Sequence, residues 1–173
     1  IIGGSGLSRM DGFRALDEFD VETPFGRPSG PVVAGEMSGV RGAFLPRHGA
    51  GHRLPPHRVP YRANIFALKA LGASSVIAVN AVGSLDIDCA PGHLVVPDDL
   101  FDRTYGRPMS FFDEGLVAHV GFGRPYCPPC RSALLAASEA ADTGVHDGGT
   151  LVVTQGPRFS TRAESRLFRS AGF

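Results

Sequence analysis

Arg47 and His48 directly follow a short apolar run at residues 42–45, in a stretch that is dense in basic side chains. An arginine forks two hydrogen-bond donors toward an oxyanion, and a histidine adds a further donor or a partial charge. Their place directly after a predicted strand favours contact with an anion such as phosphate. For His52 and His57, in the same loop, ligand contact and simple exposure to solvent are equally good interpretations.

Small and polar residues close two other apolar runs and suit the same ligand. The segment 3–6 (Gly-Gly-Ser-Gly) follows the apolar start of the chain, and Asn80 and Ala81 follow the run at 76–79. Small residues let backbone N–H groups approach an anion closely, and ligands gather at the carboxyl ends of strands in open α/β sheets. We therefore expect three strand ends to meet at one phosphate pocket, to which Ser5 offers its backbone N–H and its hydroxyl.

The same glycines invite comparison with a dinucleotide-binding turn. Their spacing departs from G-x-G-x-x-G because Ser8 stands where the third glycine belongs. No clean strand that ends in an acidic residue follows about 20 residues later, as that site requires. A short phosphate-binding turn is the better interpretation, with a purely structural turn as the alternative.

Three aspartates, Asp98, Asp99 and Asp102, could be mistaken for a catalytic carboxylate set or a Mg²⁺ site. We favour a structural interpretation, because Arg103 and Arg107 are close enough in sequence to neutralise them and acids at the end of a strand commonly start turns.

The cysteines do not form a metal-binding or disulfide pattern. Three cysteines, an odd number in Pro-rich surroundings, argue against a disulfide framework. Cys127 and Cys130 form a C-x-x-C that lacks the second pair or the histidines a zinc site needs, and a redox site would require the motif to open a helix after a strand. A Pro-stiffened loop before a helix is the favoured interpretation, and no metal site is predicted.

The composition is that of an ordinary globular protein. The chain has 173 residues, of which 43% are hydrophobic, and 17 basic residues balance 17 acidic ones. A neutral chain lacks the field that draws nucleic acid or an anionic membrane, and no apolar run approaches the roughly 20 residues of a membrane span. Nothing has the layout of a signal peptide, and both ends look cut rather than natural. We expect one α/β domain over 1–173, in the cytoplasm, with no nucleic-acid or membrane partner.

Alternating strand and helix patterns position the candidate residues. Apolar runs bounded by glycine or proline predict strands, and apolar residues at helical spacing predict helices. The predicted strands cover 1–2, 31–36, 42–46, 76–79, 93–97 and 150–154, and the predicted helices cover 61–71, 132–141 and a segment capped by Ser160 or Thr161. Of these, 76–79 has the character of a buried strand of a parallel sheet.

Phe159 follows the last predicted strand. An aromatic ring at the mouth of a sheet can stack on a flat ligand such as a base, and packing in the core is an equally good interpretation.

Short strings across the whole chain resemble the trimeric purine nucleoside phosphorylase family, and within it the methylthioadenosine phosphorylases. The strings are residues 2–7, 23–26, 47–49, 61–65, 80–85, 102–104 and 156–165. The resemblance implies a mixed, largely parallel central sheet flanked by helices, lacking its C-terminal third. It also implies a homotrimer with a shared active site. The implied reaction is phosphorolysis of 5'-methylthioadenosine to adenine and 5-methylthioribose 1-phosphate, with inorganic phosphate as co-substrate and no metal or organic cofactor.

The resemblance assigns residues to the phosphate site. The phosphate positions of the family fall on Ser5, Arg47, His48, Asn80 and Ala81, the last acting through its backbone N–H.

It also assigns residues to the nucleoside site. Phe159 matches a residue that packs beside base and ribose, and His119 matches one that a subunit lends to its neighbour's methylthio pocket. Ser160 matches a position where methylthioadenosine enzymes tend to carry Ser and 6-oxopurine enzymes an acid. The general acid, an Asp that serves purine N7, is expected beyond residue 173.

Two alternatives to this function stay open. A phosphorylase of 5'-methylthioinosine, or of inosine and guanosine, is the first, although Ser160 argues against it. A catalytically inactive nucleoside- or phosphate-binding relative is the second. Gln155, where many relatives carry Glu, is the visible departure that would favour it.

Overall fold

The computed structural model describes residues 1–4, 11–141 and 143–173. The chain forms two compact units, the first made of Ile1–Ala81 with Pro108–Phe111 and the second of Val82–Arg107 with Phe112–Phe173. The expectation of a single domain over 1–173 stays a prediction. Within the described ranges, no helix is long and apolar enough to span a bilayer.

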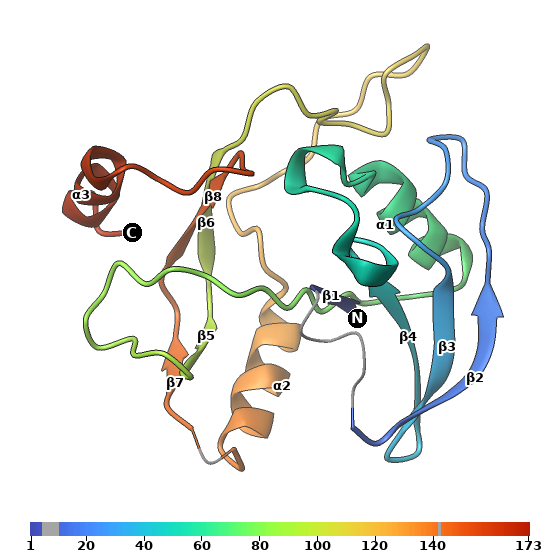
Figure 1. Cartoon of the computed structure of the whole chain (residues 1–173), viewed down its shortest axis with the longest axis horizontal. Helices are drawn as coiled ribbons and strands as arrows, with labels where there is room; N and C mark the ends of the chain where they lie inside the picture. Colours follow the sequence, from blue (N-terminus) through green and yellow to red (C-terminus); the bar gives the residue numbers. More distant parts are fainter. Residues whose placement is uncertain (5–10, 142) are drawn as a thin grey trace. The chain divides into compact units, whose positions relative to one another are not determined.

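A mixed four-stranded sheet forms the frame of the first unit (Figure 1). Its strands are β1 (Ile2–Gly3), β2 (Phe13–Phe19), β3 (Val32–Met37) and β4 (Val40–Pro46), in the spatial order β1-β4-β3-β2. β1 runs parallel to β4, and the other neighbours are antiparallel.

The hairpin of β3 and β4 confirms the prediction for 31–46. Its two-residue turn, Ser38 and Gly39, has φ angles of 50° and 80°. Positive φ angles at both positions fit a tight turn between strands with the usual right-handed twist. β2 was not predicted, because its sequence FRALDEF is largely polar and almost wholly exposed. Such a strand lies at the sheet edge and carries no alternating apolar signal.

Helix α1 (Tyr61–Ala70) covers this sheet and confirms the predicted helix (Figure 1). Its Ala67 and Leu68 are buried and form the core with Ile2, Val32 and Leu45. The helix ends where predicted, because Gly72 adopts a φ of 89° that an L-residue rarely takes. Two 3-10 turns, η2 (Ala50–His52) and η3 (Pro56–Arg58), lie in the loop between β4 and α1.

The prediction of a buried strand at 76–79 is wrong. Ala78 forms only an isolated parallel bridge with Ile2, held by hydrogen bonds from Ile2 N to Ile77 O (2.8 Å) and from Val79 N to Ile2 O (3.0 Å). Val76, Ile77 and Val79 are 41%, 38% and 41% exposed. The run lies parallel to its neighbour, as expected. In the described part of the chain, however, it pairs only with the two-residue β1, and so short a partner supports a single bridge and no longer strand.

The second unit pairs its strands in parallel throughout. β5 (Leu94–Val96) pairs with β7 (Val145–Asp147), and β6 (Asp99–Arg103) pairs with β8 (Thr150–Thr154). β5 and β8 confirm the strands predicted at 93–97 and 150–154. Together with the parallel pair of the first unit, this agrees with the mixed, largely parallel α/β class.

The helices of the second unit are α2 (Pro128–Ser138) and α3 (Arg162–Ser170). Both were predicted, but α2 begins four positions earlier than expected, because Pro128 and Pro129 fit the first helical turn, where no N–H partner is needed. Arg131 ties α2 to the strands, since its Nε donates to Pro97 O (2.8 Å) and its Nη2 donates to Val96 O (3.1 Å) and to Asp147.

Candidate functional site

Three segments of the first unit meet at Arg47, which directly follows β4. The backbone N–H of Arg47 donates to Gly3 O (2.9 Å), at the end of β1. Its side-chain Nη1 donates to Val79 O (3.4 Å), one residue before Asn80. A Cβ added to Gly4 would lie 3.2 Å from Arg47 Nη2, so the backbone after β1 passes directly beside the guanidinium. The ends of the three runs that the sequence singled out therefore converge on one arginine.

The guanidinium of Arg47 is half-buried without a carboxylate to balance it. Its side-chain hydrogen bonds go to His48 Nε2 and Val79 O, and no acidic residue pairs with it in the described ranges. Burial lowers the pKa of Arg47, against the opposing influence of nearby Tyr61. A cation that has lost part of its hydration without gaining a counter-charge attracts an anionic ligand.

His48 is held beside Arg47 by three neighbours. Its Nδ1 lies 2.7 Å from Leu54 O, and its backbone O accepts from Leu54 N (3.0 Å). Its Nε2 lies 3.4 Å from Arg47 Nε. The ring of His52 stacks on it, with centroids 4.2 Å apart and planes 23° apart. His48 is therefore fixed with one ring nitrogen toward Arg47.

Gly49 allows this turn to pack against the preceding loop. Its φ is 72°, and a Cβ there would lie 2.8 Å from Ser29 O. Ser29 is itself buried and anchored, because its N–H donates to Asn64 Oδ1 (2.8 Å) and its Oγ accepts from Asn64 Nδ2 (2.9 Å). A side chain at position 49 would push the turn that carries Arg47 and His48 away from this anchor.

The other predicted phosphate residues lie close in sequence to this cluster. Asn80 and Ala81 are exposed and directly follow Val79, whose carbonyl contacts Arg47. Ser5 lies outside the described residues. The roles assigned to these five positions stay predictions.

Phe159 and Ser160 lie in the second unit, on the loop from β8 to α3. Phe159 is 91% exposed, so the core-packing alternative is wrong for this chain. Ser160 Oγ lies 2.8 Å from Ser165 Oγ. The helix cap is Thr161, whose Oγ1 accepts from Glu164 N (3.2 Å) while Glu164 Oε2 accepts from Thr161 N (2.6 Å). The hydroxyl of Ser160 is thus not consumed in capping α3.

His119 lies in the connection between β6 and α2 and is exposed. In the described residues it makes no hydrogen bond or ring contact. The role expected for it, in a neighbouring subunit, stays a prediction.

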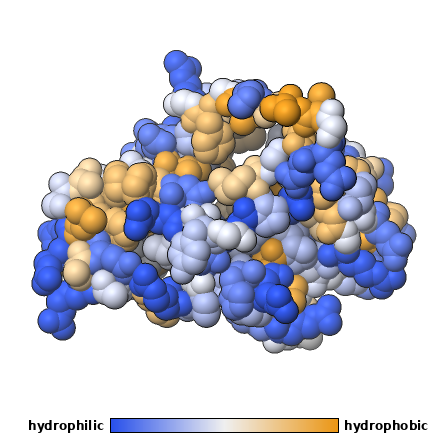
Figure 2. Space-filling model, turned by 90° about the horizontal axis from the view of Figure 1, so that it is seen from above, coloured by the Kyte–Doolittle hydropathy of each residue, from blue (hydrophilic) through white to orange (hydrophobic). Residues whose placement is uncertain are grey.

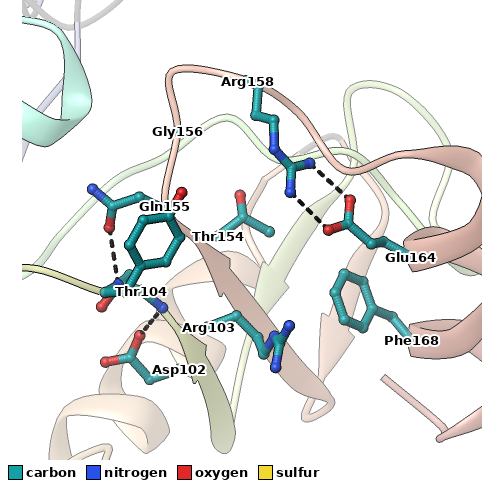
Figure 3. Close-up of a pocket in the computed structure, with 10 residues that line it drawn as sticks. Asp102, Arg103, Thr104, Thr154, Gln155, Gly156, Arg158, Glu164 and Phe168 are labelled. Atoms are coloured by element: carbon teal, nitrogen blue, oxygen red, sulfur yellow. Dashed lines mark hydrogen bonds and ion pairs between the residues drawn. The ribbon is translucent and has the colours of Figure 1, made fainter.

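A pocket of about 260 Å³ opens between β6, β8 and α3 (Figure 3). Arg158 crosses one side of it and forms a two-point ion pair with Glu164, at 2.8 and 2.7 Å. This pair, with the N–H of Thr161, lowers the pKa of Glu164 from 4.5 to about 2. The remaining lining residues are Asp102, Arg103, Thr104, Tyr105, Thr154, Gln155, Gly156 and Phe168.

Sequence reasoning missed this pocket because residues 98–102 were interpreted as a turn. Asp99–Arg103 instead form β6, and each aspartate satisfies backbone donors. Asp98 Oδ1 accepts from Gly149 N (2.9 Å), and Asp102 Oδ1 accepts from Thr104 N (2.7 Å). The structural interpretation of these acids agrees with this geometry.

The described residues hold no group of three or more His, Cys, Asp and Glu that could bind a metal ion. Cys89, Cys127 and Cys130 are free thiols. The expectation that the protein needs no metal or organic cofactor is untested.

Comparison with known proteins gives consistent matches along the chain. The model of the phosphorylase superfamily matches residues 1–173. The S-methyl-5'-thioadenosine phosphorylase of Chloroflexus aurantiacus is 56% identical over 173 residues, which are 99% of this chain and 60% of that protein. The enzyme of the same name from Mycolicibacterium smegmatis is 53% identical over 100% of this chain and 64% of its own length.

Solved structures agree with the sequence matches. A methylthioadenosine phosphorylase from an antarctic soil metagenomic library superposes with a TM-score of 0.93 at 46% identity, over 99% of this chain and 61% of that one. The methylthioadenosine phosphorylase of Schistosoma mansoni in complex with adenine has a TM-score of 0.92 at 37% identity, over 99% and 69%. The chain thus spans about 60% of the length of the first curated relative, and the fold class is shared.

Proposed function

This chain belongs to the phosphorylase superfamily, and on that premise we propose that the whole protein cleaves 5'-methylthioadenosine with inorganic phosphate. The products are adenine and 5-methylthioribose 1-phosphate. The proposal draws support from relatives named S-methyl-5'-thioadenosine phosphorylase at 56% and 53% identity. In this proposal phosphate itself is the nucleophile, and no metal or organic cofactor takes part.

The observation that carries the proposal is the half-buried guanidinium of Arg47, which lies where three chain segments converge and pairs with no acid in the described part of the chain. Its hydrogen bonds to Val79 O and His48 Nε2, both at 3.4 Å, leave its charge uncompensated, while the backbone N–H of Arg47 donates to Gly3 O. A phosphate dianion supplies the missing charge. Asn80 and the backbone N–H of Ala81, which follow Val79, complete the proposed cradle together with Ser5.

The chemistry explains why such a cradle accelerates the reaction. Breaking an N-glycosidic bond builds positive charge on the ribose, so a phosphate held below C1' stabilises that charge and is already in position to attack. The leaving purine takes up a proton or a strong hydrogen bond at N7. The acid expected for that step lies beyond residue 173 and stays a prediction.

The exposed aromatic ring of Phe159 suits a flat ligand. Its 91% exposure leaves a ring face free for a purine or ribose, which an aromatic group binds by stacking. Ser160, next in the chain, carries no charge and so fits a 6-aminopurine better than an acid would. These features support the aminopurine substrate over the 6-oxopurine alternative.

The proposed assembly is a homotrimer in which His119 serves the neighbouring subunit. Its support is the connection from β6 to α2, which carries many exposed apolar side chains around His119. Figure 2 shows that apolar groups, in orange, lie open at the surface. Contiguous exposed apolar residues mark protein contacts. Those that flank His119 in the chain are Leu116, Val117, Val120 and Phe122, which are 60%, 80%, 77% and 62% exposed.

The direct test is adenine release from 5'-methylthioadenosine by the full-length protein, with and without phosphate, beside 5'-methylthioinosine and inosine. We expect adenine alone, and only with phosphate. Hypoxanthine release would favour the 6-oxopurine alternative. A folded protein inactive on all three substrates would instead be a nucleoside- or phosphate-binding relative.

A further inference from the structure

We propose that His52 is a positioning residue for the phosphate site, acting through His48. This inference rests on the proposed function, because it assigns a further residue to the same anion cradle. His52 itself is exposed and would not touch the phosphate. Its task is to hold the ring of His48 so that one nitrogen faces the anion beside Arg47.

The hydrogen bonds of His48 show which of its ring nitrogens faces the anion. Its Nδ1 lies 2.7 Å from the carbonyl oxygen of Leu54, which can only accept, so Nδ1 carries a proton. In the neutral ring Nε2 is then without a proton, and it accepts from Arg47 Nε at 3.4 Å. Nε2 is therefore the nitrogen left to meet a phosphate at Arg47. It does so by accepting a hydrogen bond from a P–OH group of the phosphate.

The hydrogen bond to Leu54 O (2.7 Å) fixes one end of the His48 ring, and the longer one from Arg47 Nε (3.4 Å) restrains rotation about that bond only weakly. The stacked ring of His52, with centroids 4.2 Å apart and planes 23° apart, blocks that rotation from one face. Rotation would swing Nε2 away from Arg47 Nε. The stack thus supplies the restraint that the hydrogen bond alone lacks.

The backbone at His52 has an unfavourable conformation that makes the stack possible. Its φ is 56°, in the left-handed region that side chains other than those of Gly, Asn and Asp seldom adopt. Gly51, just before it, has a φ of 69°. Two successive left-handed residues turn the chain back on itself, which brings the ring of residue 52 over residue 48. Strained backbone of this kind persists where the surrounding structure demands it.

The test uses two substitutions that separate the ring from the backbone. His52→Asn keeps a residue that accepts a positive φ but removes the ring, and His52→Phe keeps a flat ring without nitrogen atoms. The full-length protein and both variants are measured for direct phosphate binding by calorimetry. For the same proteins we also measure the KM for phosphate, the KM for nucleoside, kcat and the melting temperature.

We expect His52→Asn to weaken phosphate binding about three- to tenfold, the range that loss of one aromatic stack gives, with little change in KM for the nucleoside. His52→Phe should restore most of the loss. The matched control is His57→Asn, because His57 is exposed in the same loop and makes no hydrogen bond or ring contact in the described residues. It should bind phosphate like the wild type.

The outcomes separate this inference from the proposed function. Equal phosphate affinity in wild type and His52→Asn, with loss of binding in Arg47→Ala, would overturn the role of His52 and leave the phosphate site standing. A wild type that binds no phosphate would overturn both. A His52→Asn variant that loses phosphate and nucleoside affinity and melting temperature together, without rescue by Phe, would show a merely structural residue.

Discussion

Arg47 in the first unit and Arg158 in the second use the same side chain in opposite ways. Arg158 is exposed and bound at two points to Glu164, at 2.8 and 2.7 Å. Arg47 is half-buried, donates only to a ring nitrogen and a carbonyl oxygen, and pairs with no acid in the described ranges. An arginine already matched to a carboxylate holds a loop to a helix, whereas one left unmatched is available to a ligand. The neighbours of an arginine, more than its place after a strand, distinguish the two roles.

The substitution with the largest expected effect is Arg47→Ala in the full-length protein, which tests whether the unmatched arginine binds phosphate. Loss of a charge-assisted contact should raise KM for phosphate about 10- to 100-fold. KM for the nucleoside should change little, and so should the melting temperature, because the guanidinium pairs with no acid among the residues that the structure describes. Steady-state kinetics with each substrate varied in turn measure this. Arg58→Ala, an exposed cation in the same loop, is the control, and equal effects on both KM values would remove Arg47 from the phosphate site.

The second prediction concerns His119, which makes no hydrogen bond or ring contact within the described residues of its own chain. His119→Ala should raise KM for 5'-methylthioadenosine about five- to tenfold and KM for adenosine less, because the lost contact is to the apolar methylthio group. The two substrates are compared on one enzyme preparation, with the oligomeric state checked by light scattering. Equal losses on both would place His119 outside the 5' pocket.

For the loop that Arg158 holds through Glu164, we expect substitutions to change stability and not substrate binding. Thr161→Ala removes the helix cap that shares Glu164 with Arg158, and it should cost about 1 kcal/mol of unfolding free energy. KM for phosphate should stay at the wild-type value. Denaturant unfolding of the two proteins measures the first quantity. A large change in KM for phosphate with unaltered stability would show that this loop serves the anion site after all.

The smallest expected effect is a pH dependence of stability. The pKa of Glu164 is lowered from 4.5 to about 2 by Arg158 and Thr161, so its contribution to folding is fully present above pH 4.5. That contribution is lost as the pH falls from about 4.5 toward 2. Melting temperatures of wild type and Glu164→Gln should therefore converge over this window. Parallel curves would mean that the ion pair adds nothing to stability.

Local sequence patterns predicted most of the secondary structure. The hairpin, α1 and β8 agree with prediction because each has an apolar run or helical period bounded by glycine, proline or a capping residue. β2 and β6 were missed because polar and acidic side chains conceal a strand whose faces are mostly exposed. The run at 76–79 was misjudged for the opposite reason, since apolar residues alone do not supply a partner strand.

For the site, the sequence by itself determined that Arg47 and His48 end an apolar strand and that small residues end two others. It also determined the family, through strings spread over the whole chain. Only the tertiary structure decided that Val79 and Gly4 come to the same guanidinium, that Leu54 fixes the proton of His48 and that His52 stacks on its ring. The reason is that composition and period encode local conformation, whereas contacts between distant segments depend on how the strands pair and how the loop turns back.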